Sequence, residues 1–382
     1  MNANNHIRKH YPYELIMRYA RLLGFGDIHT KLDPKTGMNA IIAIHNIDLG
    51  PAIGGVRFLQ YDAAGQAIID SLRLAYMMTL KAAISGLAHG GAKSVIIAPP
   101  HLKDREHLFE HFGDFIHETN GRYIAACDVG TTTDDMDVIA RRTPYVIGAA
   151  KTKNFETSPS IHTAKGVFLG MKAAVHHRFK QYSFDGLRVA IQGAGSVASH
   201  LTQLLVEAGA IVTACDPNAD QLDQLKSLHN IKTVASDAIY DVPCDIFSPC
   251  ALGNTINFNS IKQISATIIA GAANNQLSHP RIAKLLLDRG ITYAPDFVIN
   301  AGGLINAAMV YDYQDPGLAD TKIDQLYNTL LTLFERSSRE NTNTLKLAKT
   351  VALARLRQAS VNNETQFTHP QQNQPLSEDF HE

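Results

Sequence analysis

Apolar and polar positions in the first third of the chain follow two different periods. The run MNAIIAIHN (residues 38–46) predicts a buried strand, and the glycine-rich segment GPAIGGVRF after it predicts a loop. From residue 67 to residue 80, apolar side chains recur at helical spacing, so Lys81 falls near the C-terminus of a helix. The β-branched run SVIIA (94–98) predicts a further strand with Lys93 at its entrance.

A second amphipathic helix and another strand follow. The apolar face of this helix is formed by Leu108, Phe109, Phe112, Phe115 and Ile116. RYIAAC then predicts a strand, and in DVGTTTDDMDVIA the threonines can cap a helix that begins with three aspartates. Asp128 therefore lies at the carboxyl end of a strand, which in open α/β sheets is the edge where ligands bind.

The second half of the chain alternates short apolar runs with helical patterns, which predicts a parallel, doubly wound sheet. The polar segment around residues 149–162 predicts an interdomain crossing. We therefore expect an α/β fold of two domains with a cleft between them. The expected parts are a substrate and oligomerisation domain (1–149), a Rossmann-type domain (150–335), a helical stretch from Ile323 to Arg357 whose part around 336–358 packs back on the first domain, and a disordered tail (360–382).

Composition excludes several classes of function. The 382 residues carry a net charge of −1, with 45% hydrophobic and 19% charged residues, so neither nucleic acid nor a membrane surface is an expected partner. No apolar run reaches about 20 residues, and the first residues do not resemble a secretion signal, so we expect a cytoplasmic protein. Cys127, Cys215, Cys244 and Cys250 form no CxxC pair, and no histidine pattern indicates a metal.

The stretch LRVAIQGAGSVASHLTQLLVEAGAIVTACD has the pattern of a dinucleotide-binding unit. A strand leads into Gly193 and Gly195, Ala198 replaces the third glycine, and a second strand ends at Asp216. The glycines allow close approach of a pyrophosphate to a helix N-terminus, and a carboxylate at Asp216 favours NAD over NADP. The alternative is a packed turn without a ligand.

Two lysines lie in small and apolar surroundings, in LKAAISGLAHGGAKSVII. Burial lowers the pKa of a lysine, so Lys81 or Lys93 could exchange protons near neutrality, while the other, still charged, holds a substrate carboxylate and Asp128 shuttles protons. With a hydride acceptor in the adjoining domain, these groups suggest oxidative deamination of an amino acid. The alternative is that both lysines extend into water and Asp128 merely caps a turn.

The chain resembles the Glu/Leu/Phe/Val amino acid dehydrogenases from about residue 12 to about residue 355, most closely the leucine dehydrogenase branch. Eight segments carry the resemblance, in the family's order: GPAIGGVRF, MTLKAAISGLAHGGAKSVI, GRYIAACDVGTTTDDMD, TAKGVFLGMKAA, VAIQGAGSVA, CDIFSPCALGNTIN, IAGAANNQL and APDFVINAGG. The resemblance implies an NAD-dependent, reversible conversion of an L-amino acid to its 2-oxo acid and ammonia. It also implies closure of the two domains and a homo-oligomer assembled through the first.

The resemblance also implies roles for individual residues. Lys93 matches the catalytic lysine that activates water, Asp128 matches the acid that relays protons, and Lys81 matches the lysine that binds the α-carboxylate beside Gly54 and Gly55. An apolar pocket wall is expected from Ile53, Ala126 and Val298, and Asn300 is expected to contact substrate or cofactor. The expected cofactor contacts are Gly193, Ala194, Gly195, Ser196, Val197, Asp216, Thr163, Cys250, Ala251, Ala272 and Asn274.

Some positions depart from the family pattern. His89 replaces an apolar residue, Ala92 a glycine, Lys165 an aromatic residue and Val56 a threonine. If the backbone at Ala92 required a positive φ, alanine would be strained there, and His89 could pack in the core, shift the pKa of Lys93 or reach the substrate.

Two alternatives to an apolar amino acid dehydrogenase stay open. One is an atypical glutamate dehydrogenase, which Ile53 opposes because family members that act on glutamate have a lysine there. The other is a catalytically weak NAD-binding regulatory protein. Its discriminating feature would be cofactor binding without turnover.

Overall fold

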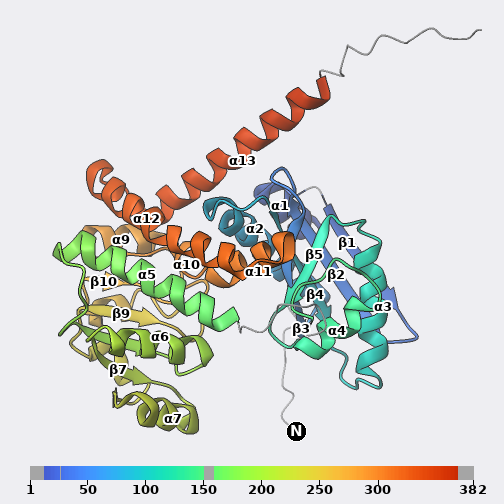
Figure 1. The fold of residues 1–382 in the computed structure, drawn as a ribbon. Helices are drawn as coiled ribbons and strands as arrows, with labels where there is room; N and C mark the ends of the chain where they lie inside the picture. The colour runs from blue at the N-terminus through green and yellow to red at the C-terminus, as the bar shows by residue number, and fades with distance from the viewer. Residues whose placement is uncertain (1–12, 26, 150–158, 369–382) are drawn as a thin grey trace, which may run out of the picture.

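A computed structural model describes residues 13–25, 27–149 and 159–368, and it has two α/β domains (Figure 1). In the first domain five strands form a mixed sheet in the order β1-β2-β4-β3-β5. Strands β3, β4 and β5 are mutually parallel, so their carboxyl ends meet at one edge, whereas β1 and β2 pair in antiparallel fashion. The bounds are β1 (Asp27–Asp33), β2 (Met38–Asn46), β3 (Ala52–Leu59), β4 (Gly90–Ile97) and β5 (Tyr123–Cys127).

Helices cover both faces of this sheet. They are α1 (Tyr13–Leu23), α2 (Ala64–Ile84), α3 (Arg105–His117) and α4 (Thr133–Ala140). Strand β2 alternates between the two layers, since Ile41 and Ala43 pack toward α2 while Ile42 packs toward α3. The predicted apolar face of α3 is buried, and Thr132 caps α4 by exchanging hydrogen bonds with Asp135, so both predictions are confirmed.

Two local predictions in this domain are wrong. The segment GPAIGGVRF is not a loop, because its residues from Ala52 onward form β3. Lys93 does not stand at a strand entrance but is the fourth residue of β4. The reason is the role of the glycines: a Cβ on Gly54 would collide with the carbonyl of Ala92, and a Cβ on Gly91 would collide with Thr79 of α2. These glycines permit close approach of backbones rather than a turn.

The second domain contains a six-stranded, fully parallel sheet in the order β11-β10-β9-β6-β7-β8. This is the doubly wound Rossmann arrangement, in which the strand order reverses between β6 and β9, and it confirms the predicted fold class. The bounds are β6 (Arg188–Gln192), β7 (Ile211–Cys215), β8 (Lys232–Thr233), β9 (Ile246–Pro249), β10 (Ile268–Ile269) and β11 (Thr292–Tyr293).

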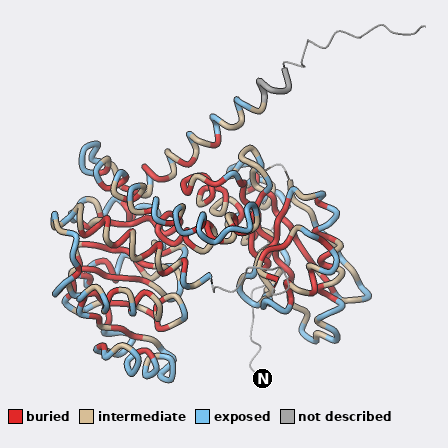
Figure 2. Tube along the Cα trace, in the orientation of Figure 1, coloured by how far each residue is buried: buried red, intermediate tan, exposed pale blue. Residues whose placement is uncertain are grey.

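Helices pack on this sheet and continue toward the first domain. They are α5 (Pro159–Phe179), α6 (Ser196–Glu207), α7 (Ala219–His229), the 3₁₀ helix η1 (Ala238–Asp241), α8 (Ser260–Gln263), α9 (Arg281–Asp288), α10 (Asp296–Ile299), α11 (Gly302–Tyr313), α12 (Pro316–Glu340) and α13 (Thr344–Thr368). Figure 2 shows that buried residues form continuous cores in both domains. Of the predicted crossing at 149–162, residues 159–162 already belong to α5, and residues 150–158 lie outside the described ranges.

The predicted helical stretch from Ile323 to Arg357 is two helices. Asn341 adopts a left-handed conformation (φ 47°) that ends α12. Helix α13 then packs on α2, and it continues to Thr368, so disorder was wrongly expected for residues 360–368. Residues 369–382 lie outside the described ranges. Within those ranges, no helix is long and apolar enough to cross a membrane.

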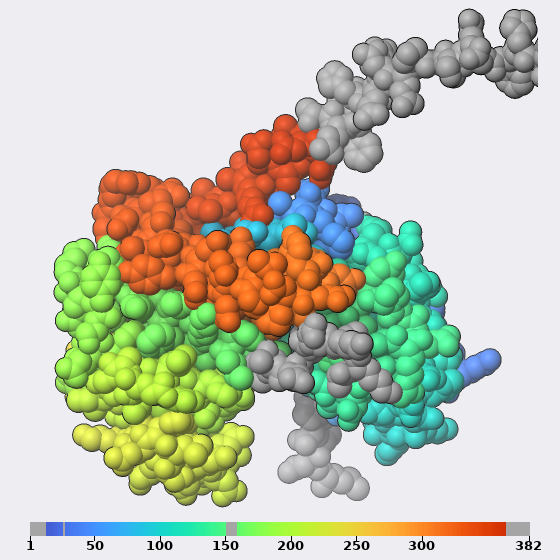
Figure 3. Space-filling model, in the orientation of Figure 1, coloured from blue at the N-terminus to red at the C-terminus, as the bar shows by residue number. Residues whose placement is uncertain are grey.

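Arg355 of α13 hydrogen-bonds the end of α2, beside the apolar contact between the two helices. The Arg355 guanidinium donates to the carbonyl oxygens of Ala83 (2.9 Å) and Leu87 (3.0 Å). These carbonyls belong to the last turn of α2 and the loop after it, where a helix lacks internal donors. In the space-filling view, the orange segment that includes α11 lies between the two domains, and α13 runs above α2 (Figure 3).

We expect Arg355→Met to lower the free energy of unfolding by roughly 2 kcal/mol, because two carbonyls lose a charged donor. Urea unfolding at fixed protein concentration measures the change. The control is Arg357→Met, since Arg357 is exposed and, within the described part of the chain, donates only to Leu353 on its own helix. Equal stability of the two variants would contradict this role for Arg355.

Candidate active site

A cavity of about 540 Å³ lies between the two domains. Its first-domain wall comes from β3, the C-terminal half of α2, β4 and the end of β5, and its second-domain wall comes from α5, the first turn of α6, α10, α11 and the turn after β10. The cavity brings together many of the residues singled out in the sequence: Ile53, Gly55, Lys81, Lys93, Ala126, Asp128, Thr163, Val197, Ala272, Asn274 and Asn300.

Lys93 and Asp128 form the central ion pair. The Nζ atom of Lys93 lies 2.7 Å from Oδ2 of Asp128, and only 6% of the Lys93 side chain is exposed. Burial lowers the pKa of Lys93, although the carboxylate of Asp128 opposes this effect. Burial acts to raise the pKa of Asp128, but the positive charges of Lys93 and Arg57 outweigh it, so the pKa lies below its usual value. Lys93 therefore gives up its proton more readily than a solvent-exposed lysine, while Asp128 holds its negative charge.

Lys81 lies in the last turn of α2, as the helical spacing predicts, and faces the same cavity. Burial lowers its pKa to about 8, while the carboxylate of Asp296 acts in the opposite direction. Asp296 lies at the start of α10 in the second domain, and burial raises its own pKa. Among the described residues that line the cavity, Lys81 is the one cation without an ion pair. It is thus the cation best able to receive a carboxylate.

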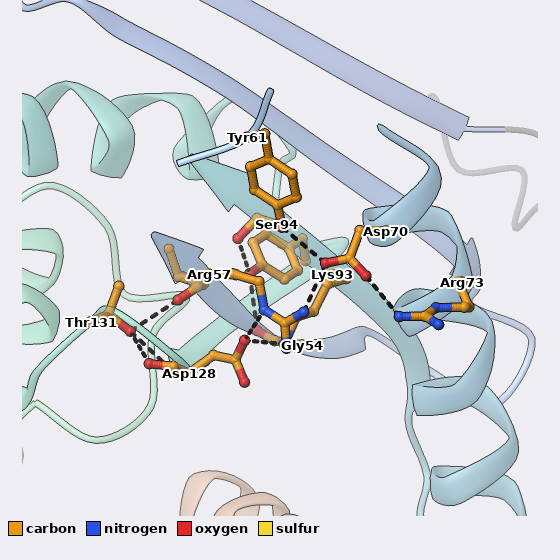
Figure 4. A network of polar contacts seen from close by, with 11 residues as sticks. Gly54, Arg57, Tyr61, Asp70, Arg73, Lys93, Ser94, Asp128 and Thr131 are labelled. Atoms are coloured by element: carbon orange, nitrogen blue, oxygen red, sulfur yellow. Dashed lines mark hydrogen bonds and ion pairs between the residues drawn. The ribbon is translucent and has the colours of Figure 1, made fainter. Parts of the chain in front are cut away.

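Sequence reasoning did not identify Arg57, which also lines the cavity. Its Nε donates to Oδ2 of Asp128 (2.9 Å), and its Nη1 donates to Oδ2 of Asp70 (2.7 Å). Figure 4 shows this network extending from Lys93 through Asp128 and Arg57 to Asp70 and Arg73. The sequence contains one indication of this role, an arginine within the otherwise apolar run GGVRF. The structure shows that this run lies in a largely buried strand.

Gly54 and Gly55 make room for these groups. A Cβ on Gly55 would lie 2.7 Å from Cβ of Asp128 and 3.0 Å from Nζ of Lys93. The Tyr123 hydroxyl donates to the carbonyl of Gly54 (2.9 Å) and is itself 2.8 Å from the hydroxyl of Ser94, which fixes the strand behind the site. Any side chain at Gly55 would therefore displace the ion pair.

Much of the remaining cavity wall is apolar. Ile53 and Ala126 contribute to it as expected, whereas Val298 does not: Val298 is fully buried in the core, and its neighbour Phe297 lines the cavity instead. In the short helix α10 the cavity is lined by Phe297, whereas Val298 and Ile299 pack in the core, which the sequence alone could not show. Further apolar lining residues are Leu74, Met77, Met78, Ile147, Leu304 and Ala307.

The turn between β6 and α6 has the shape of a pyrophosphate site. Gly193 adopts φ +114°, and a Cβ there would lie 3.0 Å from backbone atoms of Cys250 and Ala251, so these residues lie against the turn. Gly195 has no atom within 4 Å of a Cβ position and precedes an α6 N-terminus that lacks a side-chain cap. Open space above uncapped helix amides fits a bound phosphate group, and Ser196 is the first residue of that helix.

Asp216 follows β7 at the same edge of the sheet. One carboxylate oxygen accepts from the amide of Ala194 (2.7 Å), and the other accepts from the amide of Asn218 (2.8 Å). These bonds hold the carboxylate beside the glycine turn, where an acid would meet the adenosine ribose of a dinucleotide. The structure thus fits a nicotinamide dinucleotide at this turn.

Asn300 links the residues expected at the nicotinamide end. Its Nδ2 donates to the carbonyl of Ala272 (3.0 Å) and to Oδ1 of Asn274 (2.7 Å). Its Oδ1 is buried and has no hydrogen-bond partner within the described part of the chain. A buried acceptor without a partner is unfavourable, so a donor on a ligand would stabilise it. Thr163 and Val197 reach the same cavity from α5 and α6.

The departures from the family pattern have structural explanations. His89 is 2% exposed and contacts the carbonyl of Pro51 (2.9 Å) and the carboxylate of Asp312 on α11 (2.9 Å), so it links the domains and does not line the cavity. Ala92 is not among the described non-glycine residues with positive φ, so the strain considered above is absent. Lys165 pairs with two aspartates of α12, Asp320 (2.8 Å) and Asp324 (3.0 Å).

The cysteines are free thiols, and the described chain shows no cluster of three or more metal-ligating side chains. Burial raises the pKa of Cys127, Cys215 and Cys244 to about 11, which disfavours the reactive thiolate. The chemistry of the cavity therefore rests on its lysines and carboxylates.

The sequence matches two adjacent family profiles. Residues 27–145 match "Glu/Leu/Phe/Val dehydrogenase, dimerisation domain", and residues 159–220 and 216–363 match "Glutamate/Leucine/Phenylalanine/Valine dehydrogenase". These profiles together span both domains.

Individual relatives agree with the profiles. The chain is 43% identical over 342 residues to the leucine dehydrogenase of Geobacillus stearothermophilus, covering 89% of this chain and 93% of that protein. It is 38% identical over 330 residues to the valine dehydrogenase of Streptomyces virginiae, covering 86% and 92%. The crystal structure of L-tryptophan dehydrogenase from Nostoc punctiforme superimposes with a TM-score of 0.79 at 36% identity, covering 90% of this chain and 99% of that one.

We expect Lys81 to react with cyanate as a neutral amine with a half-maximal rate near pH 8, because burial lowers its pKa to about 8. Only the deprotonated amine is nucleophilic, so the rate rises as the pH passes the pKa. Peptide mass spectrometry measures the rate at each pH, with the exposed Lys262 as reference. A midpoint near the usual lysine value of about 10.4 would contradict the burial argument.

Proposed function

This chain belongs to the Glu/Leu/Phe/Val dehydrogenase family, and from that membership we propose that it oxidatively deaminates an apolar L-amino acid with NAD. The balanced reaction converts an L-amino acid, NAD⁺ and water to a 2-oxo acid, ammonium, NADH and a proton. The observation that carries the proposal is the buried Lys93–Asp128 pair, which lies with the unpaired Lys81 in an otherwise largely apolar cavity. The reaction needs all three features at once.

The substrate is held at two ends. Lys81 binds the α-carboxylate, because it is the cavity cation without a carboxylate partner among the described residues, and Gly55 lines the same cavity. The side chain of the substrate packs against the apolar wall that includes Ile53 and Ala126. A glutamate side chain would bury a second carboxylate against isoleucine, at a cost of several kcal/mol. The leucine, valine and tryptophan dehydrogenases among the relatives support an apolar substrate, with a branched-chain amino acid as the first choice.

Lys93 and Asp128 move the protons. As a neutral amine, Lys93 takes a proton from the water that attacks the imine carbon of the substrate, and Asp128 relays protons to and from the substrate nitrogen. When bound, the nicotinamide accepts the hydride that leaves Cα. The low exposure of Lys93 keeps bulk water away from these steps. Closure of the two domains over the cavity would exclude water further.

The cofactor is held by the second domain. Gly193, Ala194, Gly195 and Ser196 bind the pyrophosphate at the start of α6, and Asp216 binds the adenosine ribose. Toward the nicotinamide, Thr163, Ala272, Asn274 and Asn300 line the cavity, and Asn300 offers its buried Oδ1 to a donor. Cys250 and Ala251 support the glycine turn from behind.

Assembly into a homo-oligomer is part of the proposal. The profile that matches residues 27–145 is described as a dimerisation domain, which supports association through the first domain.

An absorbance assay of NADH tests the function with a panel of L-amino acids, and in reverse with 2-oxo acids and ammonium. We expect turnover with leucine or valine and none with glutamate, and we expect Lys93→Ala to lower kcat by at least about 100-fold because a general base is lost. NAD binding by the Lys93→Ala protein, measured by fluorescence titration, should stay unchanged. Tight NAD binding without any turnover by the wild type would favour a regulatory protein, and turnover with glutamate would favour a glutamate dehydrogenase.

We expect the wild type to prefer NAD over NADP, because the carboxylate of Asp216 repels a 2′-phosphate. Asp216→Ser should reduce the ratio of kcat/KM for NAD to that for NADP on the order of 10- to 100-fold. Asp220→Ser is the control, since Asp220 lies exposed in the first turn of α7 and is not among the expected ribose contacts. An unchanged ratio in the Asp216 variant would remove Asp216 from the ribose site.

A further inference from the structure

One carboxylate oxygen of Asp128 forms ion pairs with two cations. Oδ2 lies 2.7 Å from Nζ of Lys93 and 2.9 Å from Nε of Arg57 (Figure 4). Exposed fractions are low for all three side chains: 22% for Asp128, 18% for Arg57 and 6% for Lys93. A single carboxylate oxygen thus has one more positive partner than it needs for charge balance.

The two cations differ in whether they can lose a proton. Lysine becomes a neutral amine when its pKa is lowered, whereas a guanidinium stays charged in proteins. If Lys93 were the sole partner of Asp128, its deprotonation would leave a buried carboxylate unpaired, and such a loss costs several kcal/mol. Lys93 would then remain an ammonium ion and could not accept a proton from water.

We propose that Arg57 is the permanent counter-ion of Asp128 and so allows Lys93 to give up its proton during turnover. This inference rests on the proposed function, in which Lys93 acts as a base. Arg57 acts through Lys93 and Asp128 and is therefore a positioning residue. It keeps Asp128 paired in both protonation states of Lys93.

The far side of the guanidinium is fixed by Asp70. Nη1 of Arg57 donates to Oδ2 of Asp70 (2.7 Å), and the same oxygen accepts from the hydroxyl of Tyr61 (2.9 Å). The other oxygen of Asp70 accepts from Arg73 (3.0 Å). These contacts come from β3, the turn after it and α2. They hold the guanidinium in one position, so it stays beside Asp128 whether or not Lys93 carries its proton.

The surrounding charges determine the direction of the effect on the pKa of Lys93. Burial lowers this pKa most, Asp128 and Asp70 raise it, and Arg57 lowers it; the further charged groups on neighbouring elements are Lys81 of α2 and Asp296 of α10. Arg57 also lowers the pKa of Asp128. Removing the guanidinium therefore raises both pKa values, and both groups hold their protons to higher pH.

The test is the pH profile of kcat for amino acid oxidation in Arg57→Gln. The acid limb of this profile should move to higher pH by about one to three units, because a charge at this distance shifts a pKa by about that amount. At pH 7 turnover should fall by at least about 10-fold and recover at alkaline pH. Arg57→Lys keeps the positive charge and should shift the limb less, and it serves as the second variant if the glutamine protein does not fold.

The matched control is Arg142→Gln in the same domain. Arg142 also donates to one aspartate through its guanidinium, at 2.8 and 3.0 Å from Asp114, but this pair does not line the cavity. Its acid limb should coincide with that of the wild type. A loss in Arg57→Gln that is equal at every pH would show a merely structural role and overturn the proposal.

A second measurement separates this proposal from the proposed function. Carbamylation of Lys93 by cyanate, followed by peptide mass spectrometry without substrate, reports its neutral amine directly. Arg57→Gln should move the pH midpoint of that reaction upward, and an unchanged midpoint would overturn the role of Arg57. If the wild type turned over none of the amino acids while the midpoint still shifted, the proposed function would fall and the counter-ion role would stand.

Discussion

The ion pair between Lys93 and Asp128 is the interaction on which the arrangement of the first domain depends. A lysine that is 6% exposed on a central strand is tolerable because a carboxylate lies 2.7 Å away. That carboxylate follows β5, two strands away from β4 in the sheet, so β3 must pass between them without a side chain in the way. Gly55 meets this requirement, since a Cβ there would lie within about 3 Å of both charged side chains. The glycine at position 55 of β3 is thus a consequence of the pair.

The segments that carry the two lysines are held by helices from the end of the chain. Lys81 and Lys93 lie on either side of the loop that joins α2 to β4. Arg355 of α13 bonds carbonyls at the end of α2 and in this loop, and His89 in the loop contacts Asp312 of α11. One ring nitrogen of His89 contacts a backbone carbonyl and the other contacts the carboxylate of Asp312, so the loop is held at both ends of the ring. Residues of α11 and α13 therefore hold the segment that carries both lysines.

The sequence correctly predicted those elements that are determined by residues close together in the chain. The apolar face of α3, the threonine cap of α4 and the parallel sheet of the second domain all follow from periodicity or from neighbouring residues. The strand β3 was predicted as a loop because glycine usually indicates a turn. The glycines are present instead because the backbone contacts residues far along the chain. The hydrogen bonds of Arg57 could not be predicted from the sequence for the same reason, since its partners Asp70 and Asp128 are 13 and 71 residues away. Val298 was misplaced because the direction of a side chain depends on the short helix α10.

The charges that line the cavity also argue for the class of substrate. Arg57, Lys81 and Lys93 are its described cations, and Asp128 and Asp296 are its described carboxylates. Asp128 already takes two of the cations, and Arg57 is further paired with Asp70, so Lys81 alone is available to a ligand carboxylate. An amino acid with one carboxylate satisfies Lys81 and leaves no charge unmatched on its side chain. A dicarboxylic amino acid would bring a second carboxylate to a cavity in which the other described cations, Arg57 and Lys93, are already paired. The same electrostatic balance that permits the buried pair thus favours an apolar side chain.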